Sequence, residues 1–564
     1  MVVSALRSPQ PTSTVTSSVA VLDPEELQNQ GILQLRDALN QSPGVISTST
    51  AGQQGAVGAL FIRGTSTAYS QVVLDGVRLS DSTNPMGNFL ATGHTYDLGN
   101  IEVLRGAQGA IYGGESIGGV LWLETPHGTG DPHGSTTFEG GSFGSLETHT
   151  TFQGQTGPVS YFLSGGYQET KNDGPQQFYH QSNTALRVEG KVDAVWTIGT
   201  TLRASESYYD DHGNSDNYTK TLLSTVYASG KISDVWTSRF AVGYYQELYD
   251  SYAPNPLYTY GTQMRAGSFS TDQEIKLADN LRLLAGAYFN EYDYQNTNAV
   301  SETRDHYGVY SALEWEAIQH LILSGALRWE HYDTFGDKAT WRLGSVYNVE
   351  QTGTSIKGGV GTSFRSPSFM EVYGSSYGPG NPNLSPETSL GWELGVAQKI
   401  GDHHTAELTY FHNQISDSIH SPFWGAPPVN IHGISDTDGT EFAVRGDWYD
   451  GVLSYRLAWT WLHQSLAEQP RNAATASLDW KPTPKMLLGI GATHLSDHSW
   501  GGDPISSYTI ARIYGSYQIT DKVKFLARVE NLFNEDYKLY GGYSGYGVVQ
   551  GPGTGFYAGV TMDW

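Results

Sequence analysis

Three serines of this sequence, Ser116, Ser142 and Ser376, lie in the pattern Gly-x-Ser-x-Gly. In hydrolases this pattern holds a nucleophilic serine on a sharp turn between a strand and a helix of an α/β sheet. None of the three has that context, and a chain with 67 glycines produces such matches by chance. The chain contains no cysteine, which excludes thiolate metal sites and cysteine nucleophiles. We therefore expect a protein that is not an enzyme.

The charge and hydropathy of the chain exclude two further classes of protein. The formal net charge of -25 repels the phosphates of nucleic acids, so we expect no nucleic-acid partner. No stretch approaches the ~18 to 20 uninterrupted apolar residues that a spanning helix needs. A membrane-embedded form of this chain must therefore be a closed barrel, because only helices and barrels satisfy every backbone group in lipid.

Apolar and polar side chains alternate along residues 134–564, which we expect to form one transmembrane β-barrel. In the segments 321–330, 390–396 and 556–564 the apolar residues share one face, and aromatic residues flank the segments. About 430 residues divided among ~22 strands leave ~20 for each strand and its connection, which suits ~10 spanning residues. The pattern predicts a transmembrane β-barrel of about 22 antiparallel strands. The alternative is a soluble β-sandwich or propeller, although no repeat of 40 to 50 residues supports a propeller.

Residues 11–133 differ from the rest and are predicted to form an α+β domain. Asp23 is placed to cap a helix, with Glu26 at the position for a reciprocal capping bond. Apolar residues then recur at helical spacing as far as Leu39. Short β runs follow at 60–64 and 71–79, and the second contains an Asp-Gly pair typical of a two-residue hairpin turn.

Six segments of the chain resemble, in the expected order, the motifs of TonB-dependent receptors. Two lie in the N-terminal domain and four in the predicted barrel: 61–81, 101–125, 361–374, 380–395, 430–442 and 530–537. The resemblance implies a monomeric, multi-pass β-barrel in the lipid of the outer membrane of a Gram-negative-type cell. It also implies that the N-terminal α+β domain is a plug inside the lumen. Within the family, the spacing of the first plug segment is most similar to that of vitamin B12 (cobalamin) receptors.

The resemblance also identifies a partner for the N-terminal segment, residues 1–10. The sequence at 2–7 is similar to the TonB box, which implies that Val2, Val3, Ser4, Ala5 and Leu6 contact TonB, energised by an inner-membrane complex. We expect this segment to be extended and exposed to the periplasm, because it would pair edge-on with a strand of TonB. The alternative is an ordinary unstructured tail. We interpret Met1 as an added start on a mature chain.

Plug arginines pair with barrel glutamates in this family. Arg63 and Arg105 lie in two Arg-Gly motifs of the plug, and Glu393 and Glu441 occupy the matching barrel motifs. The resemblance therefore predicts that these four residues join plug and barrel. The alternative is that each arginine meets backbone carbonyls only.

The ligand of such a receptor should meet the plug apices and the extracellular loops. Aromatic residues beside proline in two barrel loops suit rigid packing against a large amphipathic ligand, although girdle or loop packing is the alternative for each of them. The absence of histidine between Pro367 and Asn381 disfavours haem. Corrinoids remain and are favoured over ferric siderophores or other metal chelates, oligosaccharides and a passive porin-like channel. The candidate contact residues are Gln53, Gln54, Asn84, Met86, Asn88, Phe89, His94, Tyr252, Tyr258, Phe423 and Trp424.

Vitamin B12 receptors carry an aspartate-rich calcium-binding loop. Asp173 and the run that contains Asp210, Asp211 and Asp216 are the nearest approximation in this sequence. We interpret them as solvated acidic loops rather than a calcium site, and we expect no required cofactor.

Overall fold

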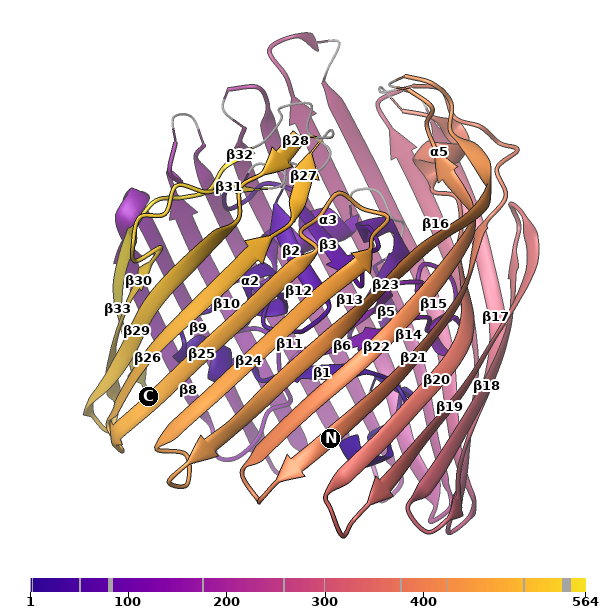
Figure 1. The fold of residues 1–564 in the computed structure, drawn as a ribbon, viewed down its shortest axis with the longest axis horizontal. Helices are drawn as coiled ribbons and strands as arrows, with labels where there is room; N and C mark the ends of the chain where they lie inside the picture. Colours follow the sequence, from indigo (N-terminus) through magenta and orange to yellow (C-terminus); the bar gives the residue numbers. More distant parts are fainter. Residues whose placement is uncertain are drawn as a thin grey trace.

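The chain forms a closed barrel with its N-terminal residues inside the lumen, as the computed structural model shows (Figure 1). The barrel has 22 antiparallel strands in the described part of the chain, so the predicted fold is confirmed and the sandwich and propeller are excluded. The structure describes residues 2, 4–49, 52–79, 85–174, 177–211, 213–256, 259–298, 300–375, 378–423, 425–500, 503–539 and 549–564. Within these ranges, none of the helices is long and apolar enough to cross a bilayer.

The plug is built around a five-stranded sheet in the order β1-β6-β7-β4-β5, in which only β4 and β7 are parallel. A separate hairpin, β2–β3, lies beside it. The plug elements are η1 (Thr12–Thr14), β1 (Val19–Leu22), α1 (Pro24–Asn29), α2 (Leu35–Leu39), β2 (Val45–Ser49), β3 (Gly58–Ile62), η2 (Thr67–Tyr69), β4 (Ser70–Leu74), β5 (Val77–Arg78), α3 (Pro85–Thr92), β6 (Asn100–Arg105), α4 (Gly109–Tyr112) and β7 (Gly119–Glu124).

The first plug helix begins where the sequence predicts, but it is shorter than the helical spacing suggested. Asp23 accepts hydrogen bonds from the backbone amides of Glu25 and Glu26, at 2.9 and 3.4 Å. The carboxylate of Glu26 turns instead to Arg456 of the barrel, at 2.8 Å. Gly31 has a φ of +71° and separates α1 from α2, so the expected single helix is two short ones.

The Asp-Gly turn between β4 and β5 forms as predicted. Asp75 and Gly76 have φ values of +52° and +86°, the two positive values that a type I′ turn requires. The turn leads β5 back along β4 with Leu74 opposite Val77.

The barrel strands follow one another in chain order, and the last strand closes on the first. Tyr557 of β33 pairs with Gly141 of β8, and Ser135 pairs with Asp563 at the other end. The division at residue 133 that the sequence suggested lies at the first residue of β8. The elements are β8 (His133–Gly141), η3 (Ser142–Gly144), β9 (Ser145–Thr156), β10 (Val159–Thr170), β11 (Tyr179–Lys191), β12 (Trp196–Asp210), β13 (Asp216–Ser233), β14 (Trp236–Tyr252), β15 (Tyr260–Ala278), β16 (Leu281–Asn296), β17 (Ser301–Ile318), β18 (Leu321–Tyr332), β19 (Gly336–Val349), β20 (Thr354–Arg365), α5 (Phe369–Tyr373), β21 (Glu387–Ile400), β22 (His404–His420), β23 (Val429–Trp448), β24 (Leu453–Gln464), β25 (Asn472–Thr483), β26 (Met486–Ser496), β27 (His498–Trp500), β28 (Asp503–Ile505), β29 (Tyr508–Thr520), β30 (Val523–Glu530), β31 (Lys538–Leu539), β32 (Val549–Gln550) and β33 (Gly555–Asp563).

The alternation in the sequence sets which side chains face lipid. On β21, Leu390, Trp392 and Leu394 are 39%, 42% and 57% exposed on the outer face, whereas Glu393 between them is 6% exposed in the lumen. At the chain end, Trp564 stacks on Phe152 of β9 with ring centroids 5.7 Å apart. The outward faces predicted from the sequence are confirmed.

The hydrophobic core lies inside the plug and extends to the inner barrel wall on one side. Buried plug residues such as Leu27, Leu60 and Leu121 share one cluster with Tyr245 and Tyr292 of the barrel. The long connections, including the one with α5, lie at the upper end of the barrel in Figure 1, and tight turns join the strands at the lower end. We call these the loop end and the turn end.

Candidate functional site: a polar latch between plug and barrel

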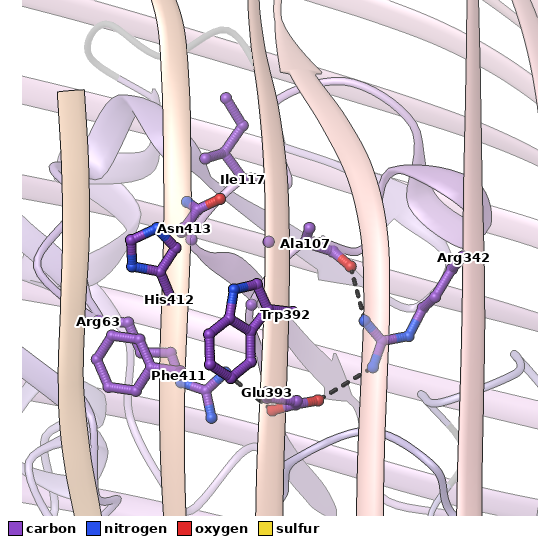
Figure 2. A pocket seen from close by; sticks show the side chains of 12 residues that line it. Arg63, Ala107, Ile117, Arg342, Trp392, Glu393, Phe411, His412 and Asn413 are labelled. Carbon is purple, nitrogen blue, oxygen red and sulfur yellow. Dashed lines mark hydrogen bonds and ion pairs between the residues drawn. The ribbon is translucent and has the colours of Figure 1, made fainter. Parts of the chain in front are cut away.

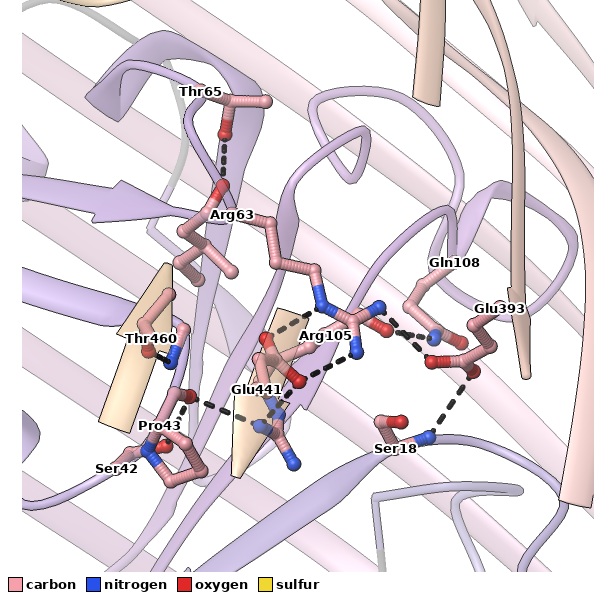
Figure 3. A network of polar contacts seen from close by, with 12 residues as sticks. Ser18, Ser42, Pro43, Arg63, Thr65, Arg105, Gln108, Glu393, Glu441 and Thr460 are labelled. Carbon is pink, nitrogen blue, oxygen red and sulfur yellow. Dashed lines mark hydrogen bonds and ion pairs between the residues drawn. The ribbon is translucent and has the colours of Figure 1, made fainter. Parts of the chain in front are cut away.

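The four residues predicted to join plug and barrel lie together in the structure. Arg63 donates from Nε and Nη2 to the two oxygens of Glu441, at 2.8 and 2.9 Å, and from Nη1 to Glu393 at 2.9 Å. Arg105 donates to Glu441 at 2.8 Å and to the carbonyl of Pro43 at 3.0 Å. Figure 3 shows Glu441 between the two guanidinium groups. Both arginines therefore bind barrel carboxylates, as the resemblance predicted, and the alternative that they meet backbone carbonyls only is excluded.

A third arginine, Arg342 of β19, completes this group. It donates to Glu393 at 3.0 Å and to the carbonyl of Ala107 in the plug at 3.1 Å (Figure 2). The amide of Ser18 also donates to Glu393, at 3.2 Å. We call Arg63, Arg105, Arg342, Glu393 and Glu441 the latch. No motif pointed to Arg342, and its one sequence signal is an inward position on an alternating strand.

The latch is almost fully enclosed. The side chains of Arg63 and Glu441 are 4% and 2% exposed, and a void of about 10 Å³ lined by Arg63, Ala107, Arg342 and Glu393 lies beside them. That void has room for about one water molecule. Burial by itself would lower the pKa of Arg63, but Glu441 and then Glu393 outweigh it and raise that pKa above its ordinary value. Arg63 therefore stays charged and needs both carboxylates.

Two residues with positive φ, a conformation that favours glycine, bring the latch together. Arg63 itself has a φ of +52°, and Gly44 has a φ of +76°. A Cβ atom on Gly44 would lie 2.0 Å from Oε1 of Glu441. The amide of Gly44 donates to Oγ1 of Thr460 in the barrel at 2.6 Å. Gly44 is thus the point where the plug backbone passes against the barrel carboxylate.

Other plug–barrel contacts carry charge but were not predicted. Asp75, assigned only to a turn, accepts from Arg187 of β11 at 2.8 Å and from the amide of Thr125 at 2.8 Å. Asp97 pairs with Arg203 of β12 at 2.7 Å. The signal for Asp75 was present in the sequence, because an Asp at a turn apex leaves its carboxylate free to reach another element.

The N-terminal segment does not lie where we expected. Ser4 and Val2 are fully buried, and Val2 bridges to Gln10 through backbone bonds of 2.8 and 2.9 Å. The amide of Ser4 donates to Glu102 of the plug at 2.9 Å. Arg7 lies 3.7 Å from Asp272 of β15. The prediction of an extended, exposed segment is wrong for this conformation, because polar groups of plug and barrel hold residues 4–7 in a turn. Ala5 is also buried, Leu6 is half-buried, and Val3 lies outside the described residues.

The predicted ligand contacts do not form one surface. Met86 lies in the plug core, Asn88 donates to Glu247 of β14 at 2.9 Å, and His94 is 1% exposed. Gln53 is buried and accepts from the amide of Asp173 at 3.3 Å. The expectation that these four residues lie at the plug surface is wrong in this conformation, because core packing or barrel contacts cover them; that they contact a ligand stays a prediction.

The remaining candidates divide between the loop end and the outer wall. Gln54 is half-buried and bonded to Asn172, and Phe89 packs partly on the plug core. Tyr252 is a correction: it is 52% exposed and packs on Tyr218, on the outer face of β13 and β14, as the alternative of girdle or loop packing describes. Phe423 is 71% exposed in the loop between β22 and β23. Asn84, Tyr258 and Trp424 lie outside the described residues.

Asp210, Asp211 and Asp216 lie in one hairpin loop, where Asp210 pairs with Asp216 in the register of β12 and β13, and Asp173 lies in another loop. Asp173 accepts from the amide of Gly553 at 2.7 Å, Asp210 from Gly213 at 2.8 Å, and Asp216 from the hydroxyl of Tyr208 at 2.6 Å. Asp211 closes the same loop through its backbone amide, which donates to Ser215 at 2.9 Å. Within the described ranges, no three His, Cys, Asp or Glu side chains are grouped to hold a metal ion.

Two of the three serines in Gly-x-Ser-x-Gly patterns can be placed. The hydroxyl of Ser116 lies 3.1 Å from that of Ser363 on β20, at the plug–barrel contact. Ser142 begins the turn between β8 and β9. Ser376 lies outside the described residues.

Comparison with known proteins identifies relatives along the whole chain. A family model described as TonB dependent receptor-like, beta-barrel, matches residues 122–532, and the TonB-dependent Receptor Plug Domain matches residues 11–120. Proteins named vitamin B12 transporter BtuB are 25% identical: that of Photobacterium profundum over 95% of this chain and 92% of its own length, and that of Vibrio vulnificus over 100% and 94%.

Solved structures share the fold at lower identity. The siderophore receptor PirA from Acinetobacter baumannii superposes with a TM-score of 0.84 at 16% identity, covering 97% of this chain and 98% of its own. A variant of the ferric enterobactin receptor PfeA from Pseudomonas aeruginosa, in complex with enterobactin, superposes with a TM-score of 0.84 at 18% identity, covering 98% and 100%.

Proposed function

The chain belongs to the TonB-dependent receptor family of the Gram-negative outer membrane, and from that premise we propose that it imports a scarce, large ligand, a cobalamin-like corrinoid. The observation that carries the proposal is the latch: buried ion pairs join the plug to the barrel at Arg63, Glu393 and Glu441, in addition to the apolar contacts of the plug core with the wall. Such pairs are specific in geometry, because the planar guanidinium matches a carboxylate in two parallel hydrogen bonds. The latch therefore suits a plug that must hold the lumen closed and later rearrange. We propose no enzymatic activity and no resident cofactor.

We further propose that residues 2–6 are the segment that TonB binds. Because Val2 and Ser4 are buried against the plug and Arg7 faces Asp272, the segment must leave these contacts before it can add a strand to TonB. The plug would then couple ligand binding at the loop end to energy input at the turn end. A passive channel would need neither event.

Deleting residues 2–7 distinguishes the receptor from a passive channel. We expect the deletion to abolish energised uptake of cyanocobalamin into cells while the purified protein still binds it. Arg7→Gln is the matched control, because it loosens the contact with Asp272 but keeps the segment for TonB. Uptake that persists at the full rate after the deletion would contradict the proposal and favour a porin-like channel.

The full-length relatives named vitamin B12 transporters support the corrinoid as ligand. A second candidate, a ferric siderophore, is favoured by one observation at the loop end. Arg304 of β17 is 4% exposed, and two of its guanidinium nitrogens, Nε and Nη2, lack hydrogen-bond partners among the described residues. It lies 4.4 Å from the ring centroid of Phe369 in α5, and Phe369 stacks on Tyr294. A buried cation beneath an aromatic loop suits an anionic chelate.

Binding titrations with the purified receptor separate the two ligands. We expect cyanocobalamin to bind at least tenfold more tightly than ferric enterobactin, and Arg304→Gln to leave the cyanocobalamin affinity within about threefold. Tighter binding of the ferric chelate, lost in Arg304→Gln, would replace the corrinoid with a siderophore. The variant Arg265→Gln is the control, since Arg265 is half-exposed on β15 beside Asp293.

A further inference from the structure

Strands β19 and β20 pair along only part of their length. β19 pairs with β18 up to Gly336, and β20 pairs with β21 from Thr354 to Arg365. The register between β19 and β20, however, runs only from Val349↔Thr354 to Arg342↔Gly361. Residues 338–341 of β19 and 362–365 of β20 therefore face each other without a backbone ladder. We call this gap, at the loop end of the wall, the seam.

The plug takes the place of β19 along the upper part of β20. The amide of Glu115 donates to the carbonyl of Phe364 at 2.8 Å, and the amide of Ser366 donates to the Glu115 carboxylate at 3.1 Å. A Cβ atom on Gly109 would lie 2.6 Å from the carbonyl oxygen of Thr362, so the plug backbone touches β20 there. The upper part of β20 thus contacts the plug backbone, whereas β19 remains paired with β18 in the barrel wall.

A cavity of about 330 Å³ fills the seam. That is far more than the ~15 Å³ that one water molecule needs. Its rim includes Trp341, Leu390 and Ile434, which are 37%, 39% and 64% exposed on the outer face of the barrel. The cavity therefore opens toward lipid rather than only into the lumen.

The inner lining of the seam is polar and carries one positive charge. Lys338 is half-buried, and no carboxylate among the described residues lies within 4.0 Å of its nitrogen. The acid whose charge acts on it, Asp417, is paired with His432 at 2.8 Å. The hydroxyl of Thr340 is buried and has no hydrogen-bond partner in the part of the chain that the structure describes.

A strand edge at membrane depth needs polar partners, because hydrocarbon offers none to backbone N–H and C=O groups. We propose that the seam binds the phosphate headgroup of an anionic outer-leaflet lipid. The amide of Trp341 already donates to the hydroxyl of Thr362 at 3.0 Å, so the hydrogen bond to the headgroup comes from the Thr340 hydroxyl. Lys338 supplies the charge, and the acyl chains lie along the apolar rim at Leu390. A neutral acyl chain alone would leave these polar groups unsatisfied.

Lipid retention measured by native mass spectrometry tests the site. Delipidated protein is titrated with phosphatidylglycerol, with phosphatidylcholine, and with phosphatidylglycerol in excess inorganic phosphate. We expect one phosphatidylglycerol to bind more tightly than phosphatidylcholine, and Lys338→Gln to weaken it about fivefold, the change that ~1 kcal/mol per basic residue gives. Lys220→Gln is the control, because Lys220 is an exposed lysine on β13 paired with Glu206 at 2.8 Å.

A second variant, Thr340→Val, keeps the charge and the side-chain shape and should weaken retention at least twofold. Equal retention by the wild type and Lys338→Gln, or equal retention of the two lipids, would overturn the proposal. Displacement of the lipid by the excess inorganic phosphate would also overturn it, since the site would then be one for free anions.

The open seam itself is tested with paired cysteines, for which the chain offers a clean background because it has none. Thr340→Cys with Ser363→Cys continues the register across the seam. Val346→Cys with Lys357→Cys is the matched control pair in the part where β19 and β20 pair through their backbones. A disulfide needs Cα atoms about 4.4 to 6.8 Å apart. We expect the control pair to oxidise fully and the seam pair to remain mostly reduced. Equal oxidation would mean that the ladder continues, and the site would not exist.

Discussion

Replacing Glu441 with glutamine removes the carboxylate that two arginines share. In the wild type, Glu441 accepts three charged hydrogen bonds, two from Arg63 and one from Arg105, at 2.8 to 2.9 Å. After Glu441→Gln, the three arginines of the latch face one carboxylate, Glu393. Arg63 keeps that partner, and Arg105 keeps the carbonyl of Pro43.

The cost follows from burial. Breaking a buried ion pair by removing one partner costs about 3–5 kcal/mol, because a charge is left without compensation. Arg63 and Glu441 are 4% and 2% exposed, so solvent does not reduce this figure. At about 1.4 kcal/mol for each factor of ten, the opening equilibrium of the latched plug region should rise by roughly two to three and a half powers of ten.

Amide hydrogen exchange measures this opening directly. The peptide that spans β2 and β3 adjoins Gly44 and Arg63, and the strands β13 and β14 provide an internal reference far along the barrel. Glu407→Gln is the control: Glu407 lies 4.0 Å from Lys357 and is 32% exposed, so its loss should cost no more than about 1 kcal/mol. Exchange of β2 and β3 in Glu441→Gln that stays within tenfold of Glu407→Gln would refute the reasoning.

Three further predictions concern the plug. Gly44→Ala should destabilise the plug, because its Cβ would lie 2.0 Å from Oε1 of Glu441. In a Glu441→Ala background the same substitution should lower the free energy of plug opening clearly less. Equal losses in a double-mutant cycle measured by hydrogen exchange would contradict this. Burial lowers the pKa of His94 against the opposing effect of Asp97, so an opened plug binds a proton more readily than the closed plug. Plug stability should therefore fall as the pH drops below about 6.5. In hydrogen exchange measured from pH 7.5 to 5, His94→Gln should flatten this decline, and an unchanged profile would exclude His94 as its source. Asp75→Gly should preserve the turn, since φ is positive there, but it removes the ion pair with Arg187 at a cost of about 3–5 kcal/mol. Amide exchange of residues 70–79 should become faster than in the wild type by the factor that this cost gives. A smaller increase would show that the pair is weak.

How much of the fold was predictable depends on the range of the interactions that set it. The alternation at Leu390, Trp392 and Leu394 is local, because neighbouring side chains of a strand point to opposite faces whatever the strand pairs with. The hairpin at Asp75 and the cap at Asp23 are local for the same reason, and both formed. The length of the first helix was not predicted, because the helical spacing continued past a glycine whose positive φ divides it.

The site was predictable only in part. The motifs contained Arg63, Arg105 and both glutamates of the latch. Arg342 matched no motif, and it joins the latch because its position on β19 places it beside Glu393. The exposure expected of Met86 and His94 was wrong, because loop composition does not reveal whether a segment packs inward. Tyr252 was expected on the inner side, because the sequence does not show whether an aromatic residue at the end of a strand points outward or into the lumen.

The sequence by itself determined the barrel, the plug and the identity of four of the five latch residues, since strand alternation and motif order are written along the chain. Only the tertiary structure decided which charges meet, where residues 2–7 lie and where the wall opens. Arg63 and Glu441 are 378 positions apart, and the gap between β19 and β20 arises because a plug residue, Glu115, competes for the backbone of β20. Contacts of this kind form only when the ring closes around the plug, so no local pattern encodes them.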